Sequence, residues 1–400
     1  MTDCSAAADV AARPAAATEW PAVVSLSLGV FSLVTAEFLP ASLLTPMARD
    51  LMISDGLAGQ AVTATAVVGA IAGPAIVVGT SRFDRRWILW GLTALLVVSD
   101  VLAAAAANLP TLLVSRVLLG VALGGFWAMS AALAMRLVPQ ELMPRAMAVV
   151  LTGVSLATVC AAPVGAWIGD HWGWRMAFIV AAVAGAAALI VQVVTVPSLP
   201  PTTKATLGAF LTLLERPRMR NGLAIVAVVV SAHFAAFTYI RPFLEQVPHM
   251  NVGAISLVLL AYGVGGFFGN LAGGFMAERS EQTAVASAAG LIAAAALILV
   301  VLGVSTGLSG AATALWGFAF GALPVGAQTW INRAAPDLAE SAGGLLLMAF
   351  QVAIATGAVF GGFLVDGFGP RGPIGYCAVA AALAALAALV ETRRPVLGKA

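Results

Sequence analysis

The segment GAWIGDHWGWR at residues 165–175 is followed, 196 positions later, by GGFLVDGFGPR at residues 361–371. Four residue types keep their places in the two copies: Gly165 with Gly361, Asp170 with Asp366, Gly173 with Gly369, and Arg175 with Arg371. Further pairs lie at an offset of 197, namely Arg136 with Arg333, Pro139 with Pro336 and Arg82 with Arg279, and Glu37-Phe38 stands opposite His233-Phe234 at 196. Self-similarity at a fixed period indicates an internal repeat, so the chain consists of two related halves.

The composition predicts that both halves lie in a membrane. Hydrophobic residues make up 61% of the 400 residues and charged residues only 10%, whereas soluble domains carry about 25% charged residues. A membrane-spanning helix needs about 20 apolar residues, and lipid leaves no partner for free backbone polar groups. We therefore predict an all-α polytopic membrane protein with twelve transmembrane helices in two pseudo-symmetric six-helix bundles, at 21–45, 57–79, 87–107, 110–136, 145–168, 175–195, 221–246, 254–277, 284–304, 308–332, 342–365 and 373–390.

Basic residues predict the orientation, because cytoplasmic loops carry an excess of Lys and Arg. With both ends of the chain in the cytoplasm, the other side holds only Arg49, Arg175, Arg241 and Arg371. The cytoplasmic side then holds Arg13, Arg82, Arg85, Arg86, Arg136, Arg145, Lys204, Arg216, Arg218, Arg220, Arg279, Arg333, Arg393, Arg394 and Lys399. The net charge of only +2 gives no reason to expect nucleic acid as a partner.

The expected organisation is a cytoplasmic tail at 1–20, a first bundle at 21–196, a cytoplasmic linker at 197–220, a second bundle at 221–391 and a tail at 392–400. Six spans per half make both halves enter the membrane from the same side. They are therefore parallel repeats related by an axis along the membrane normal. Such halves can rock about a shared site near the midplane, which is the geometry of alternating access.

Ionisable residues inside a span are costly and mark function. Glu37 in the first span and Arg116 in the fourth are expected at similar depth, and Glu37 is the first candidate for proton coupling. The alternative is a permanently paired structural carboxylate. His233, in the equivalent place in the seventh span, titrates near neutral pH and is the second candidate, the alternative being a hydrogen-bonded core histidine. Asp100 in the third span is a weaker candidate.

Polar and aromatic side chains within the spans suggest a substrate path, since aromatic faces stack on planar bases and amides read their edges. Packing is the alternative for each of them. The candidates are Phe126, Trp127, Ser130, Thr238, Tyr239, Trp316, Gln328, Thr329, Asn332 and Gln351. No phosphate-binding loop, metal-ligand cluster or nucleophile–base cluster stands out, so we expect no cofactor, no metal and no enzymatic activity.

Three motifs resemble the major facilitator superfamily, in its twelve-helix drug and sugar proton-antiporter branch. The loop with Arg82, Asp84, Arg85 and Arg86 resembles the family's basic gating loop, with Ser81 where Asp is usual, and the second-half copy runs from Gly274 through Glu278 and Arg279. Arg116 with Gly120 and Gly124 resembles the helix-four motif implicated in proton transfer. Gly153, Ala162, Pro163 and Gly165 resemble the helix-five antiporter motif, with Ala in place of its second Gly.

Longer strings resemble bacterial exporters of purine ribonucleosides within that superfamily. They are AEFLPASLLTPMARDL (36–51), GLAGQAVTATA (56–66), GGFWAMSA (124–131), AMRLVP (134–139), FTYIRP (237–242) and LPVGAQTWINR (323–333). The resemblance implies a bacterial inner-membrane antiporter, functional as a monomer in the lipid bilayer, that exports nucleosides such as inosine and guanosine, and purine analogues, in exchange for protons. The alternatives are a proton-driven efflux pump for sugars or amphiphilic drugs, and, from other classes, a membrane sensor or a membrane-embedded enzyme.

Overall fold

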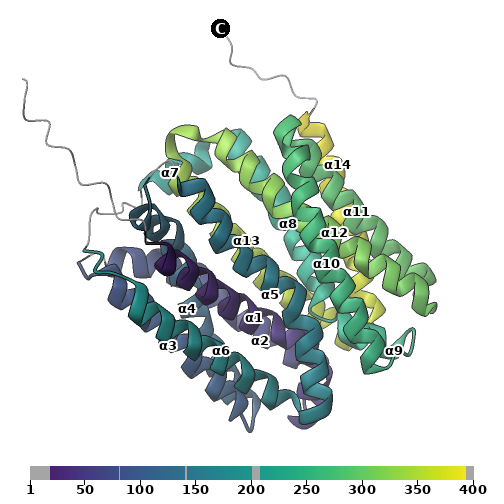
Figure 1. The fold of residues 1–400 in the computed structure, drawn as a ribbon. Coiled ribbons are helices and arrows are strands. Elements are labelled where there is room, and N and C mark those ends of the chain that lie inside the picture. The colour runs from purple at the N-terminus through teal and green to yellow at the C-terminus, as the bar shows by residue number, and fades with distance from the viewer. Residues whose placement is uncertain (1–18, 81, 140–141, 201–207, 393–400) are drawn as a thin grey trace, which may run out of the picture.

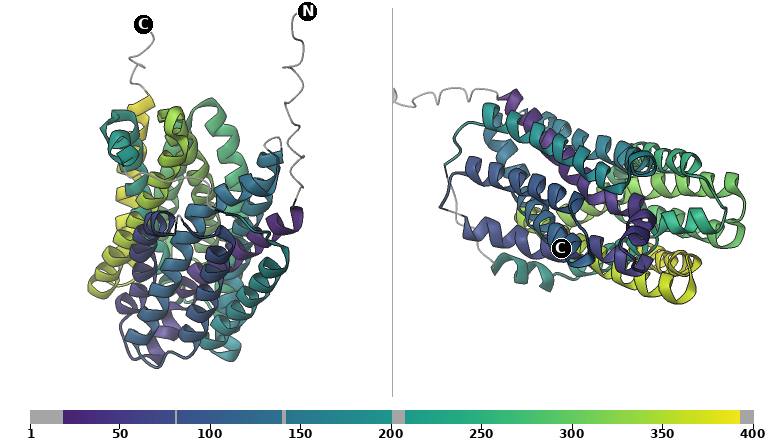
Figure 2. Two further views of the ribbon diagram at one scale, coloured as in Figure 1. Left: turned by 90° about the vertical axis from the view of Figure 1, so that its left-hand side faces the viewer. Right: turned by 90° about the horizontal axis from the view of Figure 1, so that it is seen from below.

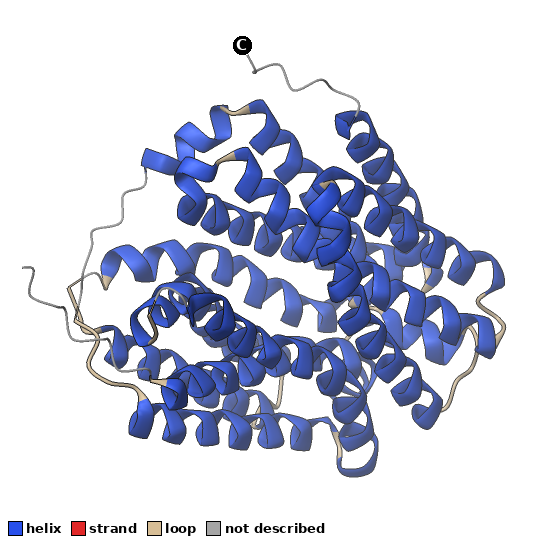
Figure 3. Ribbon diagram, turned by 45° about the horizontal axis from the view of Figure 1, so that its top comes forward, coloured by secondary structure: helices blue, strands red, loops and turns tan. Residues whose placement is uncertain are grey.

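The computed structural model describes residues 19–80, 82–139, 142–200 and 208–392. Within these ranges the regular elements are helices and no strand occurs (Figure 3). Twelve of the helices are long and apolar enough to cross a membrane, which confirms the predicted all-α class and the number of spans. Arg82, one of the predicted gating residues, lies exposed in the short loop after the second long helix.

Figure 1 shows the two bundles side by side, the first in purple to teal and the second in green to yellow. The first contains α1 (Trp20–Asp50), α2 (Asp55–Gly79), α3 (Arg85–Ala104), α4 (Leu109–Leu137), α5 (Met143–Trp172) and α6 (Trp174–Thr195). The short α7 (Gly208–Glu215) follows within the expected linker. The second bundle contains α8 (Pro217–Phe237), α9 (Ile240–Gln246), α10 (Val252–Arg279), α11 (Glu281–Leu302), α12 (Thr306–Ala334), the 3-10 turn η2 (Pro336–Leu338), α13 (Ala339–Phe368) and α14 (Arg371–Thr392).

The repeat quoted at the outset forms the same turn in both bundles. Gly173 separates α5 from α6 with φ +84°, and Gly369 precedes α14 with φ +72°. Glycine adopts such a left-handed backbone without steric cost, whereas other residues do so rarely. The two glycines therefore allow each helix pair to reverse direction within one or two residues.

Close helix contacts also repeat, at an offset of 197. A Cβ atom added to Gly124 in α4 would collide with the carbonyl oxygen of Gly69 in α2. A Cβ added to Gly321 in α12 would collide with that of Gly266 in α10. Small residues allow membrane helices to approach this closely, so the α2–α4 and α10–α12 pairs have the same construction.

One predicted helix is interrupted. We expected a continuous span over 221–246, but α8 ends at Phe237 and a separate short helix, α9, begins at Ile240. Pro242 lacks the N–H that would bond to the carbonyl of Thr238 in a continuous helix, and its ring crowds that carbonyl. The break places Thr238 and Tyr239 in a turn, where both side chains are buried.

The two bundles meet through α2 against α13 and α5 against α10. One end of the molecule, which we call the α9 end, holds the end of α1, the start of α2, α9 and the end of α13. At this end both bundles contribute to one buried apolar cluster, formed by Leu44, Ala48, Ala58, Tyr239 and Val365. The opposite end, the α7 end, is the end at which α1 begins and α14 ends (Figure 2).

Burial along α1, α8 and α9 differs between the α9 end and the α7 end of the molecule. In α1, residues 39–45 are all buried, whereas Val24 and Leu28, nearer the α7 end, are 46% and 39% exposed. In α8 and α9, residues 232–244 are all buried, whereas Val228 is 42% exposed. The two bundles are therefore tightly packed against each other at the α9 end. Nearer the α7 end, one side of α1 and one side of α8 are exposed.

Candidate functional site

Glu37 lies near the middle of α1, at the level where the two bundles begin to separate. Its side chain is half-buried and forms no hydrogen bond or ion pair within the described part of the chain. The next residue, Phe38, packs edge-on against Phe237 of α8, with ring centroids 6.2 Å apart and an interplanar angle of 76°. Glu37 is thus an ionisable group beside the contact between the bundles, with no fixed counter-charge.

Arg116 in α4 is completely buried but does not pair with Glu37. Its guanidinium lies 3.5 Å from the carboxylate of Asp100 in α3, which is also completely buried. Its remaining contacts are hydrogen bonds from Nη1 to the carbonyl oxygen of Ala36 (3.2 Å), from Nε to Ser115 Oγ (3.2 Å) and from Nη2 to Ser99 Oγ (3.4 Å), and a position 4.9 Å over the ring of Phe178.

The bond to Ala36 shows that Arg116 and Glu37 do lie at similar depth, as the sequence suggested. The charge pair inside the first bundle is nevertheless Arg116–Asp100. A buried charge is tolerated when it is paired and hydrogen-bonded, and Asp100 meets that need for Arg116. Glu37 therefore has no cationic partner among the described residues of the first bundle.

His233 in α8 is completely buried inside an aromatic cage in the second bundle. Its ring stacks on Phe320 of α12, with centroids 3.6 Å apart and an interplanar angle of 7°, and on Phe237 at 5.2 Å and 16°. Trp316 of α12 donates its indole N–H to His233 Nδ1 over 3.0 Å. The hydroxyl of Tyr262 in α10 lies 3.4 Å from Nε2.

These bonds determine the protonation state of the imidazole. The indole nitrogen of tryptophan is a donor only, so Nδ1 must present its lone pair and the ring must be neutral with its proton on Nε2. An imidazolium would place two N–H groups against each other at Trp316. In this conformation His233 therefore matches the alternative of a hydrogen-bonded core histidine.

Several of the predicted substrate residues are packed inside their own bundle, and Tyr239 lies where the two bundles meet. Phe126 lies in the core of the first bundle close to Gly29, half-buried Trp127 packs against the same core, and buried Ser130 donates to the carbonyl of Trp127 at 3.2 Å. Tyr239 belongs to the sealed α9 end, where its hydroxyl donates to the carbonyl of Ala358 at 2.8 Å. Trp316 belongs to the aromatic cage around His233.

Four other members of that set are polar side chains with a different placement. Gln328 and Asn332 are exposed near the α7 end of α12, joined by a 2.9 Å hydrogen bond. Thr329 is half-buried and bonds to its own helix. Gln351 of α13 is 4% exposed, lies 3.6 Å from the point where a Cβ on Gly69 of α2 would be, and its Oε1 has no hydrogen-bond partner.

Gln351 and the turn residue Thr238 are both buried, and each has a side-chain oxygen without a hydrogen-bond partner among the described residues, Oε1 in Gln351 and Oγ1 in Thr238. The hydroxyls of Thr35, Thr45 and Thr63 share this property. Buried polar atoms are normally hydrogen-bonded. Gln351 adds a position at the interface between α2 and α13, where a ligand between the bundles could complete its hydrogen bonding.

The first gating loop binds the start of the linker. Asp84 accepts hydrogen bonds from Ser198 Oγ (2.5 Å), Leu199 N–H (2.9 Å) and Arg86 N–H (2.8 Å). Although partial burial raises the pKa of Asp84, the bonds from Ser198, Arg86 and Leu199 and the charge of Arg86 bring this pKa below its ordinary value. Arg86 also lies over the rings of Trp87 and Trp90.

Two arginines complete this attachment. The backbone N–H of Arg85 donates to the carbonyl of Leu199 at 2.9 Å, and Nη1 of Arg136 donates to the same carbonyl at 3.3 Å. The side chain of Arg85 bonds to Thr80 Oγ1 at 3.0 Å. In this conformation the loop is held within the first bundle and its own linker.

The second gating loop contains a charge cluster that the sequence motifs did not single out. Glu278 and Arg279 have exposed side chains, and the carbonyl of Glu278 accepts from Arg333 at 3.1 Å. The cluster centres on Glu281, which is 4% exposed and accepts from both Arg333 (2.6 Å) and Arg218. The signal was present in the sequence, since Glu281 opens the helix that follows the motif and Arg333 is a repeat partner of Arg136.

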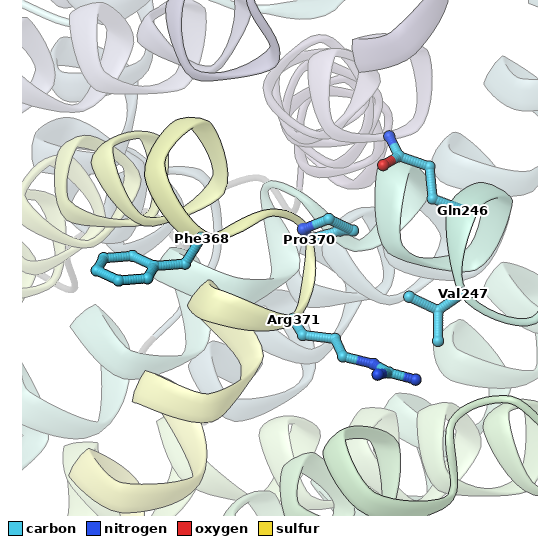
Figure 4. A pocket seen from close by; sticks show the side chains of 5 residues that line it. All are labelled: Gln246, Val247, Phe368, Pro370 and Arg371. Atoms are coloured by element: carbon cyan, nitrogen blue, oxygen red, sulfur yellow. The ribbon is translucent and has the colours of Figure 1, made fainter.

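A surface pocket of about 330 Å³ lies at the α9 end, away from Glu37 (Figure 4). Gln246 and Val247 line it from the end of α9, and Phe368, Pro370 and Arg371 line it from the turn between α13 and α14. At an offset of 196, Gln246 stands where the first bundle has Asp50, which pairs with Arg175 at 2.6 Å. The second bundle therefore lacks this ion pair on the pocket wall.

The comparisons with known proteins agree with this architecture. The model of the Major Facilitator Superfamily matches residues 26–358 and 249–400. The purine ribonucleoside efflux pumps NepI of Salmonella typhi and Salmonella enteritidis PT4 are each 41% identical over 367 residues, which cover 92% of this chain and 91% of the relative.

Solved structures show the same fold at low sequence identity. The inward-facing, occupied crystal structure of a bacterial homologue of the human lysosomal transporter Spinster gives a TM-score of 0.76 at 16% identity, covering 93% of this chain and 96% of that chain. The human organic anion transporter MFSD10 gives 0.66 at 16% identity, covering 92% and 99%. These relatives are transporters, so the chain is a multi-pass membrane transporter rather than an enzyme, and it belongs to the Major Facilitator Superfamily.

Proposed function

We propose that this chain exports purine ribonucleosides such as inosine and guanosine, and purine analogues, across the inner membrane of a bacterium in exchange for protons. Both ends of the chain lie in the cytoplasm in this proposal, because the basic residues gather at the α7 end. The cargo follows from relatives that are 41% identical over 92% of the chain and are named purine ribonucleoside efflux pumps.

The observation that carries the proton-coupled mechanism is the unpaired state of Glu37. A carboxylate between apolar bundles takes up a proton when it is desolvated and loses the proton when water or a cation reaches it. Arg116 is already paired with Asp100. It therefore does not form a permanent ion pair with Glu37 that would keep Glu37 charged. Movement of one bundle against the other changes the surroundings of Glu37, which is what coupling requires.

The proposed cycle begins with the bundles open toward the cytoplasm, where a nucleoside enters between them. The amide of Gln351 has an unpaired acceptor that a hydroxyl or amino group of the nucleoside can satisfy. Opening at the α9 end then releases the nucleoside outside and admits a proton to Glu37. Exchange follows when each ligand shifts the equilibrium between the two states by its differential affinity.

Transport of radiolabelled inosine into everted membrane vesicles tests this proposal. We expect uptake that depends on an acidic vesicle interior, disappears with a protonophore and is reduced by unlabelled guanosine but not by a sugar. Vesicles that carry Glu37→Gln serve as the matched control for coupling. Gradient-dependent uptake of a sugar or an amphiphilic dye without any uptake of inosine would assign the chain to the other cargo class.

A further inference from the structure

Asp366, at the end of α13, joins the two bundles at the α9 end. Its Oδ2 accepts a hydrogen bond from Ser54 Oγ at 2.7 Å, and its Oδ1 accepts one from the backbone N–H of Gly56 at 3.0 Å. Among the described residues, the other hydrogen bond between the bundles runs from Arg241 Nη1 to the carbonyl of Ser42 at 2.5 Å, at the same end. Asp366 is the only carboxylate among these partners.

The two bonds place a negative charge at the start of α2. Ser54 already caps this helix, because its Oγ accepts from the N–H of Leu57 at 3.1 Å. Asp366 adds a second cap from the opposite bundle, and a carboxylate at a helix N-terminus is favoured by the free N–H groups and the helix dipole. A Cβ on Gly56 would collide with the Asp366 carboxylate, so glycine permits this approach.

The internal repeat supplies a comparison within the same molecule. The counterparts of Asp366, Ser54 and Gly56 are Asp170, Asn251 and Gly253. Asn251 caps its own helix, α10, by accepting from the N–H of Ala254 at 2.8 Å. Asp170 is exposed, as Asp366 is, and its ion pair among the described residues is with His171, 4.0 Å away. The capping contact between bundles is therefore made at one of the two equivalent places.

Charged groups of both signs surround the Asp366 contact. Asp55 at the start of α2 interacts electrostatically with Asp366, with Glu245 of α9 and with Arg49 of α1. Glu245 is itself paired with Arg241 at 2.8 Å. Tyr239 lies within electrostatic reach of both Asp366 and Asp55, and Arg371 begins α14 after the turn that follows α13. Three carboxylates thus meet where the bundles close.

We propose that the Asp366 carboxylate is the latch that holds the α9 end closed, through the bonds it accepts from Ser54 and Gly56. An uncharged side chain of similar shape at this position lacks the charge that strengthens these two bonds. Asp366 acts as a positioning residue, since it holds α2 and α13 together. The proposal rests on the alternating-access cycle above, in which the α9 end opens to release the nucleoside.

A distance measurement that needs no cargo tests the latch separately from the proposed function. Spin labels are attached at Ala107→Cys, between α3 and α4, and Val304→Cys, between α11 and α12, which are both exposed at the α9 end. The native Cys4, Cys160 and Cys377 are replaced beforehand. Pulsed electron–electron double resonance on the full chain in lipid nanodiscs then measures the distance between the two labels.

We expect one short distance in the wild type. In Asp366→Asn a longer distance should gain population, because losing charge-assisted bonds changes the ratio of the closed and open states by about tenfold or more. Asp366→Glu keeps the charge and should keep the short distance. Asp170→Asn, the counterpart in the repeat, should behave like the wild type.

An Asp366→Asn variant that keeps the wild-type distance would overturn the proposal, as would an Asp170→Asn variant that opens to the same extent. If Asp366→Asn fails to fold, Ser54→Ala removes one of the two bonds, with Asn251→Ala as its repeat control. Opening in the former and not in the latter supports the latch, and an unchanged distance in both contradicts it. Failure of inosine transport with an intact distance response would refute the cargo only.

Discussion

Trp316 and His233 are joined by a 3.0 Å hydrogen bond in which only Trp316 can donate. The bond makes the imidazole an acceptor at Nδ1, although the position of His233 in the repeat is that of Glu37 in the first bundle. The residue that corresponds to Glu37 in the second bundle is thus held neutral by its neighbours in this conformation. Proton uptake by His233 would require Trp316 to turn away.

The first prediction concerns this bond. His233→Leu leaves the indole N–H of Trp316 buried without an acceptor, which should destabilise the protein by about 1–3 kcal/mol. His233→Asn offers an acceptor in place of Nδ1 and should cost less. Thermal unfolding in detergent measures both, and the pH profile of inosine exchange should survive in His233→Asn. If a folded His233→Asn variant lost that pH profile, His233 would be a proton carrier after all.

The second prediction concerns Glu37→Gln. The amide has the shape of the carboxyl group but takes up no proton at neutral pH, so proton-driven transport should vanish while nucleoside binding remains measurable. Inosine-induced thermal shifts report the binding, and vesicle uptake reports the coupling. Wild-type gradient-driven uptake in this variant would remove Glu37 from the mechanism.

The third prediction is a pH control at the α7 end, where Arg216 pairs with Asp337 at 2.6 Å. The hydrogen bond from Arg216 lowers the pKa of Asp337 to about 2, from an ordinary 3.8. Because this pKa is depressed, the stabilisation from the pair is complete above about pH 4 and disappears as the pH falls toward 2. Asp337→Asn should therefore leave the shape of the transport profile between pH 5.5 and 8 unchanged, unlike Glu37→Gln.

The fourth prediction concerns the buried pair of Arg116 and Asp100. Removing either partner leaves an uncompensated buried charge, which costs about 3–5 kcal/mol. Replacing both, as Arg116→Leu with Asp100→Leu, removes the charge altogether and should recover part of that loss. A double-mutant cycle on thermal unfolding measures the coupling energy. Single variants whose effects simply add would show that the two groups do not stabilise each other.

The helices and their number could be predicted from sequence because membrane spans leave a strong, continuous apolar signal. The break between α8 and α9 could not, since five other prolines lie inside described helices without ending them, namely Pro40, Pro46, Pro74, Pro163 and Pro324. Whether a proline ends a helix depends on how its neighbours satisfy the freed carbonyl. That information lies in tertiary contacts of Thr238 and Tyr239.

The sequence predicted the depth of the candidate site residues in the membrane, but only partly which side chains contact one another. Residue counting placed Arg116 and Glu37 at one depth, which the bond to Ala36 supports. The choice of Asp100 as the partner depends on how α3 packs against α4, and a sequence pattern does not contain the rotation of one helix against another. For the same reason Trp316 and Tyr239 were interpreted as substrate residues, although their polar atoms already have partners inside the second bundle.

The glycine contacts shared by α2–α4 and α10–α12 set the spacing of the same helix pairs in both bundles. On this common backbone the first bundle holds the Arg116–Asp100 pair, and the second holds the aromatic cage around His233. Because the glycines alone determine how closely the backbones approach, the side chains between the helices can differ from one bundle to the other without a change in helix spacing.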